Sequence, residues 1–190
     1  DLTNIYFWKI FVSLDMKKLM LLSLLILSIN LAFAQYIDSL QVNEMKKVQW
    51  LAGKWEGEGW MMFGPEEKHT FSQTETVTSK LNGLLLAIEG LGTVDESKII
   101  HNAFAVLSFD SENQRFVMRA HKADGAFTEA DALVDDNGDF IWGFNHPYAG
   151  ELRFTIRQND KGQWYEIGEV SSDDGNSWFQ NFEMLLNKVE

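Results

Sequence analysis

Apolar and polar residues alternate along most of the chain, most clearly in residues 50–60, WLAGKWEGEGW, and just beyond. One face of the expected strand is apolar or small and the other is mostly charged: Trp55, Gly57, Gly59 and Met61 against Lys54, Glu56, Glu58 and Trp60. A period of two is typical of a strand with one buried face. Glycines within a strand mark a bend or a close approach of another backbone. We therefore expect a first strand that curls tightly.

Nine further segments read as strands, and most of them end at turn residues such as Asn82-Gly83. The expected strands after the first are residues 69–80, 84–94, 103–109, 115–122, 127–134, 140–146, 151–157, 163–170 and 178–186. Short connections between consecutive strands favour an antiparallel meander. A meander of ten strands removes its exposed edges by closing on itself. The pattern predicts an all-β fold, a ten-stranded antiparallel up-and-down barrel.

One short helix is expected before the first strand. Within residues 36–49 the apolar positions Ile37, Leu40, Met45 and Val48 recur at helical intervals, and Asp38 or Ser39 is available as an N-cap.

Residues 16–34 have the pattern of a secretory signal peptide. Two lysines precede an apolar run over residues 19–33, and the small residues Ala32 and Ala34 flank Phe33 at its end. A membrane anchor is the alternative, but a spanning helix needs about 20 apolar residues, and this run is shorter and contains Ser23, Ser28 and Asn30. We expect cleavage after Ala34 and export to the periplasm or the outside of the cell.

The remaining chain, residues 35–190, is expected to form a single barrel domain. Residues 1–15 precede a methionine that resembles a natural start, so we assign them to an upstream start and exclude them from the fold. The sequence contains no cysteine, which excludes disulfides, thiolate metal ligands and cysteine nucleophiles. The formal net charge of −12 repels phosphate backbones and anionic headgroups. We expect no nucleic-acid partner and no stable membrane insertion after cleavage.

Several motifs resemble a known group of proteins. They are the opening W-L-x-G-x-W-x-G-x-G of residues 50–59, the alternation Gln73-x-Glu75-x-Val77 and the turn at Phe109-Asp110. Together they resemble an uncharacterised bacterial family of exported proteins within the calycin superfamily, similar to fatty-acid-binding proteins and nitrobindins. The resemblance implies a calycin-like barrel that holds a ligand.

Two functional features of those relatives have no counterpart in this sequence. Nitrobindins bind haem through a histidine near the C-terminus, and here no histidine follows His146. Fatty-acid-binding proteins hold a carboxylate with an arginine and a tyrosine on the last strands, and residues 178–186 contain neither.

Candidate site residues are those that share the apolar faces of the expected strands. Polar residues there need partners because burying them unpaired is costly. They either form an internal water-filled network or grip the polar head of a ligand. The aromatic residues either fill the barrel or line a pocket, and the width of a ten-stranded barrel favours the pocket. The candidate ligand-binding residues are His69, Phe71, Gln73, Glu75, Phe104, Met118, Trp142, Phe144, His146, Phe154 and Phe182.

The leading hypothesis is an exported, non-enzymatic protein that binds a small hydrophobic or amphipathic molecule and carries no cofactor. A cavity enzyme that uses Glu75 and His69 as an acid–base pair is one alternative. Another is a haem or metal site built on the two histidines, although His146 before Pro147 is more typical of a loop cap. A third is an interaction module with an exposed apolar patch at residues 60–63. The acidic turns at residues 135–139 and 172–176 lack the spacing of a calcium loop and read as Asx turns.

Overall fold

The computed structural model describes Lys18, Met20 and residues 38–62, 64, 67–95 and 97–189. The chain separates into two compact units, Asp1–Ile37 and Asp38–Glu190, and every element named below belongs to the second. The predicted signal peptide and residues 1–15 lie outside the described residues, apart from Lys18 and Met20. No helix within the described part of the chain combines the length and the apolar character needed to cross a membrane.

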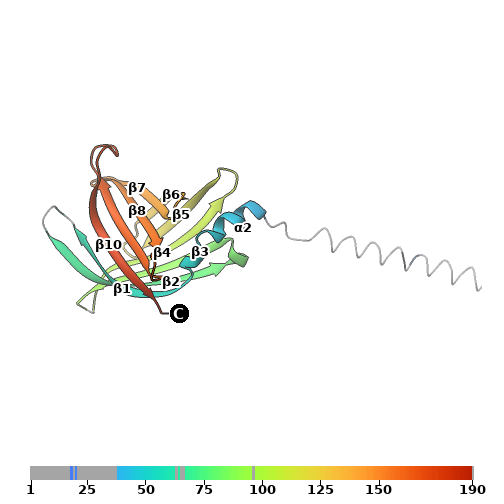
Figure 1. Ribbon diagram of the computed structural model, residues 1–190, viewed down its shortest axis with the longest axis horizontal. Helices are drawn as coiled ribbons and strands as arrows, with labels where there is room; N and C mark the ends of the chain where they lie inside the picture. The colour runs from blue at the N-terminus through green and yellow to red at the C-terminus, as the bar shows by residue number, and fades with distance from the viewer. Residues whose placement is uncertain are drawn as a thin grey trace, which may run out of the picture. The chain divides into compact units, whose positions relative to one another are not determined.

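Ten antiparallel strands form a closed barrel (Figure 1). The strands are β1 Gly53–Met62, β2 Lys68–Lys80, β3 Leu85–Val94, β4 Lys98–Asp110, β5 Arg115–Lys122, β6 Phe127–Val134, β7 Phe140–His146, β8 Gly150–Gln158, β9 Trp164–Ser171 and β10 Phe179–Lys188. Each strand pairs with its neighbour in the chain, and β1 also pairs with β10. The predicted all-β up-and-down barrel is confirmed.

The largest difference from the predicted boundaries is at β4. The alternation predicts a strand over residues 103–109, and the observed strand begins at Lys98. Pairing with β3 shifts register between Gly92 and Thr93, so the first residues of β4 lie beyond an irregularity in the ladder. A register shift breaks simple alternation, which is why residues 98–102 do not read as a strand.

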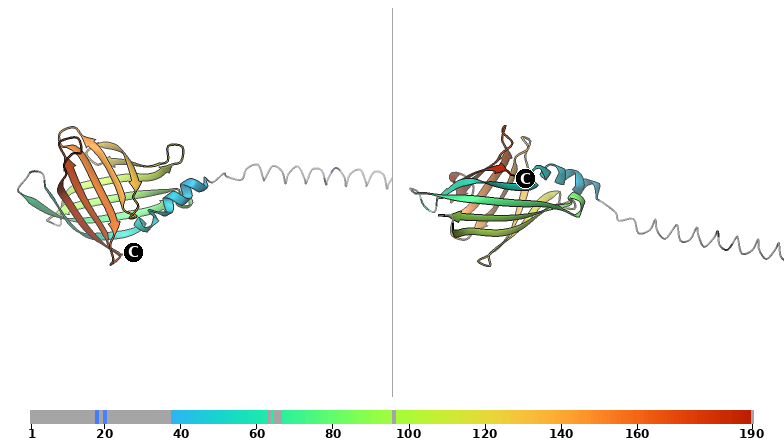
Figure 2. Two further views of the ribbon diagram at one scale, coloured as in Figure 1. Left: turned by 45° about the horizontal axis from the view of Figure 1, so that its top comes forward. Right: turned by 90° about the horizontal axis from the view of Figure 1, so that it is seen from below.

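One short helix, α2 (Ser39–Lys46), precedes the barrel strands, as predicted. Asp38 caps it, because its Oδ1 accepts hydrogen bonds from the backbone amides of Leu40 at 2.9 Å and Gln41 at 3.3 Å. Met45 and Val48 are fully buried. Leu51, the last residue of the 3-10 turn η1 (Gln49–Leu51), is buried as well. Figure 2 shows α2 against one end of the barrel. Leu40, which shares the helical spacing, is instead 41% exposed.

Trp55 anchors that end of the barrel from β1. Its side chain is fully buried and its indole Nε1 donates to the carbonyl oxygen of Leu51 at 2.7 Å. The rings of Trp50, Trp55 and Trp164 pack edge to face, with centroids 5.8–6.2 Å apart. This tryptophan cluster ties η1, β1 and β9 together.

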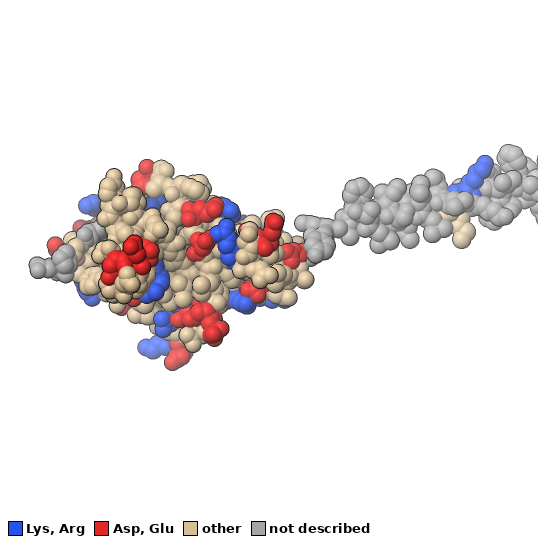
Figure 3. Space-filling model, turned by 90° about the horizontal axis from the view of Figure 1, so that it is seen from above, with Lys and Arg blue, Asp and Glu red and all other residues tan. Residues whose placement is uncertain are grey.

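The glycines of β1 leave room for neighbouring groups of the barrel. A Cβ atom on Gly57 would collide with the backbone carbonyl of Leu185, and one on Gly59 would lie 2.5 Å from the ring of Phe71. Gly57 therefore lets the two strands that close the barrel lie together. Outside the barrel, acidic and basic side chains are interspersed over the face shown in Figure 3.

Candidate functional site

The barrel encloses a cavity of about 300 Å³. Its wall is mostly apolar, and its aromatic members are Phe71, Phe140, Trp142, Phe154, Trp164 and Phe182. Two rings stack closely within the wall, because the centroids of Trp142 and Phe154 are 4.4 Å apart. Ile100 of β4 also lines the cavity and is 37% exposed, so the cavity approaches solvent near the start of that strand.

Seven of the candidate residues line this cavity. They are Phe71, Gln73, Glu75, Met118, Trp142, Phe154 and Phe182. The alternation of β2 places Phe71, Gln73 and Glu75 on its inner face, where each is at least nine-tenths buried. The structure thus brings a polar pair and five apolar side chains to one space.

His69 and Phe104 do not line the cavity, contrary to expectation. The side chain of His69 is 46% exposed at the start of β2, where its Nε2 lies 3.9 Å from Glu67. Phe104 is 43% exposed because the inner face of β4 carries its odd-numbered neighbours, Ala103 and Ala105. His69 shares the alternation of Phe71, Gln73 and Glu75, but it lies near the start of β2, at the rim of the barrel, where its side chain is exposed.

His146 also lies outside the cavity. It is exposed, and its Nδ1 accepts hydrogen bonds from the backbone amides of Tyr148 at 3.3 Å and Ala149 at 3.2 Å. It caps the turn between β7 and β8, so it does not fit the role of a haem ligand in the barrel. The acid–base pair of His69 with Glu75 is not assembled either. The two residues are six positions apart on one strand, about 20 Å at the usual rise per residue.

Phe144 lies beyond the short stretch over which β7 pairs with β6. β6 and β7 pair only at Ala132 with Trp142, Leu133 with Ile141 and Val134 with Phe140. Beyond that pairing, Phe144 lines a separate surface groove, and its ring is 6.0 Å from that of Trp142. Trp142 lines both the groove and the cavity.

Gln73 and Glu75 form a buried hydrogen-bonded pair. The amide Nε2 of Gln73 donates to Glu75 Oε1 at 2.7 Å. Two glycines on β3 make room for these side chains, because a Cβ on Gly90 would lie 2.7 Å from Glu75 Oε1 and one on Gly92 would lie 2.5 Å from Gln73 Oε1. The two glycines of Gly90-Leu91-Gly92 therefore leave the space that the side chains of Glu75 and Gln73 occupy.

Glu166 of β9 is a cavity residue that the sequence analysis missed. It is 6% exposed, and its Oε2 accepts a hydrogen bond from the indole Nε1 of Trp164 at 3.0 Å. The signal was present in the alternation Trp164-x-Glu166-x-Gly168, since an inward tryptophan places the glutamate two residues later on the same face.

Burial raises the pKa of both carboxyl groups. Desolvation is the main cause for Glu75, whose pKa rises to about 8, with the hydrogen bond from Gln73 opposing it and the charge of Glu166 adding to it. Desolvation likewise raises the pKa of Glu166 to about 7, against the hydrogen bond from Trp164. At neutral pH, Glu75 therefore retains its proton.

His101 is a second missed cavity residue, hidden by the late predicted start of β4. Desolvation lowers the pKa of its imidazole, and the nearby charge of Lys122 lowers it further. At neutral pH it is a neutral polar group. No cluster of three or more His, Asp or Glu side chains that could hold a metal ion occurs among the residues that the structure describes.

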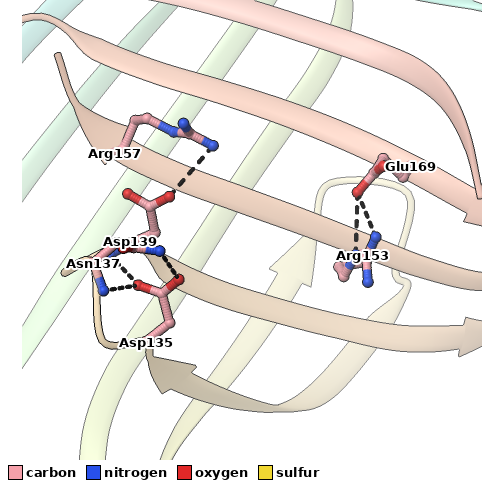
Figure 4. Close-up of polar contacts among 6 residues, drawn as sticks. All are labelled: Asp135, Asn137, Asp139, Arg153, Arg157 and Glu169. Atoms are coloured by element: carbon pink, nitrogen blue, oxygen red, sulfur yellow. Dashed lines mark hydrogen bonds and ion pairs between the residues drawn. The ribbon is translucent and has the colours of Figure 1, made fainter.

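The acidic turn after β6 is an Asx turn, as its sequence predicts. Figure 4 shows Asp135, whose Oδ1 accepts from the backbone amides of Asn137 at 2.9 Å and Asp139 at 2.8 Å. Asp139 in turn lies 3.3 Å from Arg157. The carboxylates of Asp135 and Asp139 thus bind groups of the protein itself.

The apolar patch considered at residues 60–63 is only partly described. Lys68 Nζ lies 3.4 Å from the centroid of the Trp60 ring, which it covers, and Phe63 lies outside the described residues.

Comparison with known proteins relates this chain to others through its fold. No model of a protein family matches the sequence, and a search of curated proteins finds no match. Among solved structures, the chain is similar to the crystal structure of Rv2717c from M. tuberculosis, with a TM-score of 0.55 and 10% sequence identity. The similarity covers 82% of this chain and 100% of that chain. At this identity the likeness shows a shared fold.

Proposed function

We propose that this protein is an exported, non-enzymatic binding protein whose barrel holds a small hydrophobic or amphipathic molecule. The observation that carries the proposal is the cavity of about 300 Å³, with its aromatic wall and its few buried polar groups. Ligand pockets commonly combine such a wall with a small number of placed polar groups, and this volume is at the lower end of their range. A ligand of modest size fits it.

Membership of a superfamily and export from the cytoplasm are part of the same proposal. The opening motif of β1 and the fold shared with Rv2717c support membership of the calycin superfamily. The charged start, apolar run and small-residue end of residues 16–34 support export to the periplasm or beyond. Acid–base catalysis by the pair of Glu75 and His69 is disfavoured, because His69 lies at the rim, far from Glu75.

Filling the cavity tests the proposal directly. Ala105→Phe replaces a buried wall residue with a ring that occupies the cavity, so we expect the variant to lose binding of the neutral fluorescent probe N-phenyl-1-naphthylamine. Val106→Phe, on the same strand but not part of the cavity wall, is the matched control and should keep it. Binding is measured by fluorescence titration, and circular dichroism checks that both variants fold.

Two results would contradict cavity binding. One is a wild-type protein that takes up no probe, and the other is equal uptake by Ala105→Phe and the wild type. Native mass spectrometry before and after solvent extraction provides an independent readout. A bound small molecule should add to the mass of the protein before extraction and be lost afterwards.

A further inference from the structure

Two buried carboxyl groups share this cavity, and the described residues give neither of them a positive partner. Glu75 is 8% exposed and Glu166 is 6% exposed. Among the described residues, each carboxyl accepts one side-chain hydrogen bond, from the Gln73 amide and the Trp164 indole respectively. Both donors are neutral. Because an ionised carboxylate is costly to bury unless a cation compensates it, a cation bound in the cavity would allow these groups to ionise.

Among the described residues, no cationic side chain lies in the cavity wall beside these carboxyl groups. The described residues that line the cavity include no lysine and no arginine. His101 is their only basic group, and desolvation together with Lys122 lowers its pKa. An anionic head such as a carboxylate or phosphate would therefore find no counter-ion here, and would face two acidic groups.

We propose that the ligand carries a protonated amine, which contacts the carboxyl groups of Glu75 and Glu166 while its apolar part packs against the aromatic wall. This inference rests on the proposed function, since it names the chemical class of the molecule that the cavity holds. Aromatic faces add to the attraction, because a desolvated cation interacts favourably with the rings of tryptophan and phenylalanine. Phe71, Trp142 and Phe182 are among the rings of the cavity wall that could make such a contact.

Ligand entry should release protons. The titratable groups that line the cavity are Glu75, Glu166 and His101. Near neutral pH Glu75 holds its proton and Glu166 is partly protonated, because burial raises the pKa of both. An incoming ammonium group stabilises the ionised forms and so displaces these protons. Affinity for an amine should therefore rise between about pH 6 and about pH 9, whereas affinity for a neutral alcohol should not.

The test compares octylamine, octanol and octanoate, which share an eight-carbon chain and differ in the charge of the head. Isothermal titration calorimetry with the purified protein should show octylamine binding at least about 10-fold more tightly than the other two, the factor that 1.4 kcal/mol provides. Titration in two buffers of different ionisation enthalpy measures the protons released on binding.

Charge-removing variants complete the test. Glu75→Gln with Glu166→Gln keeps an acceptor oxygen for Gln73 and Trp164 and removes both acidic groups, so it should weaken octylamine binding at least about 10-fold and abolish proton release. Octanol binding should be retained. Glu89→Gln is the matched control, because Glu89 is exposed on β3 and lies outside the cavity wall.

The outcomes separate the two proposals. Equal binding of the three compounds, or unchanged octylamine binding in the double variant, overturns the amine proposal. If N-phenyl-1-naphthylamine binds the cavity and octylamine does not, the amine proposal fails while cavity binding stands. If neither the probe nor any of the octyl compounds binds, both proposals fail. A double variant that still binds the neutral probe shows that its fold is intact.

Discussion

Glu75 and Glu166 determine the chemistry of the cavity at the scale of single residues. Their carboxyl groups reach the cavity from β2 and β9, and each is held by one neighbour on its own strand. Gly90 of β3 supplies the space that the first of them occupies. Carboxyl groups in such surroundings hold their protons more tightly than in water, so they link the stability of the barrel to pH.

We expect the free energy of unfolding to fall as pH rises from about 5 to about 9. The pKa values of Glu75 and Glu166 rise from 4.5 to about 8 and about 7 on folding. Across this window the two folded carboxyl groups bind more protons than the unfolded chain. His101, whose pKa is lowered from 6.5, opposes them in the lower part of the window, but the two carboxyl groups outweigh one imidazole, so raising the pH favours unfolding. Each group contributes up to about 1.4 kcal/mol per pH unit between its two pKa values.

Urea unfolding at several pH values measures this effect. The double variant Glu75→Gln with Glu166→Gln should show a much flatter dependence, and the exposed Glu89→Gln should follow the wild type. The turn residues Asp110, Asp135 and Asp173 do not confuse the result, because their pKa values are lowered and they titrate below the window. A wild-type midpoint that does not fall with rising pH contradicts the prediction.

At the scale of elements, the seam between β1 and β10 decides whether the sheet closes. The two strands pair from Trp55 with Lys188 to Met61 with Phe182. Gly57 leaves no room for a side chain within this seam, since an added Cβ would meet backbone atoms of Leu185 and Leu186. Backbone atoms cannot move aside as the end of a side chain can, so the seam itself would have to shift.

Gly57→Ala should therefore destabilise the barrel. Overpacking of this kind costs about 1–3 kcal/mol, and the loss should appear as a lower denaturation midpoint in urea. Gly64→Ala is the control, because a Cβ at Gly64 meets no heavy atom within 4 Å. Equal urea midpoints for the two variants would contradict the prediction, because they would show that the seam accommodates an added methyl group.

At the scale of the whole molecule, α2 and the barrel share one hydrophobic core. Met45 of α2 belongs to the same buried cluster as Trp55, Leu86 and Leu186 of the strands. A helix that contributes to the main core cannot separate from the barrel without exposing that core. Unfolding should therefore be one cooperative transition of the unit Asp38–Glu190.

Met45→Ala tests this coupling. We expect a loss of about 2–5 kcal/mol in the free energy of unfolding, typical of a large buried side chain replaced by alanine. Leu40→Ala, on the same helix but 41% exposed, should cost far less. Tryptophan fluorescence and far-ultraviolet circular dichroism should report the same midpoint in both variants. A separate early loss of helix signal in Met45→Ala would show that α2 unfolds independently.

The sequence alone determined the strands, their order and the capped helix. Alternation is a local property of an extended backbone, so residues 69–80 predict both β2 and the inward placement of Gln73 and Glu75. Asp38 is a local signal of the same kind, because it caps amides only two and three residues away. Such features depend on neighbours in the chain and can be read without a tertiary structure.

The tertiary structure alone decided where the cavity lies and which groups meet in it. Closure of the sheet brings Glu166 from β9 to the cavity that holds Glu75 from β2. The length of β2 relative to the barrel places His69 at the rim. Gly90 matters because its missing side chain leaves space for the carboxyl group of Glu75. Cavity volume and the contacts between distant strands depend on how side chains from the whole barrel pack together, which no local pattern encodes.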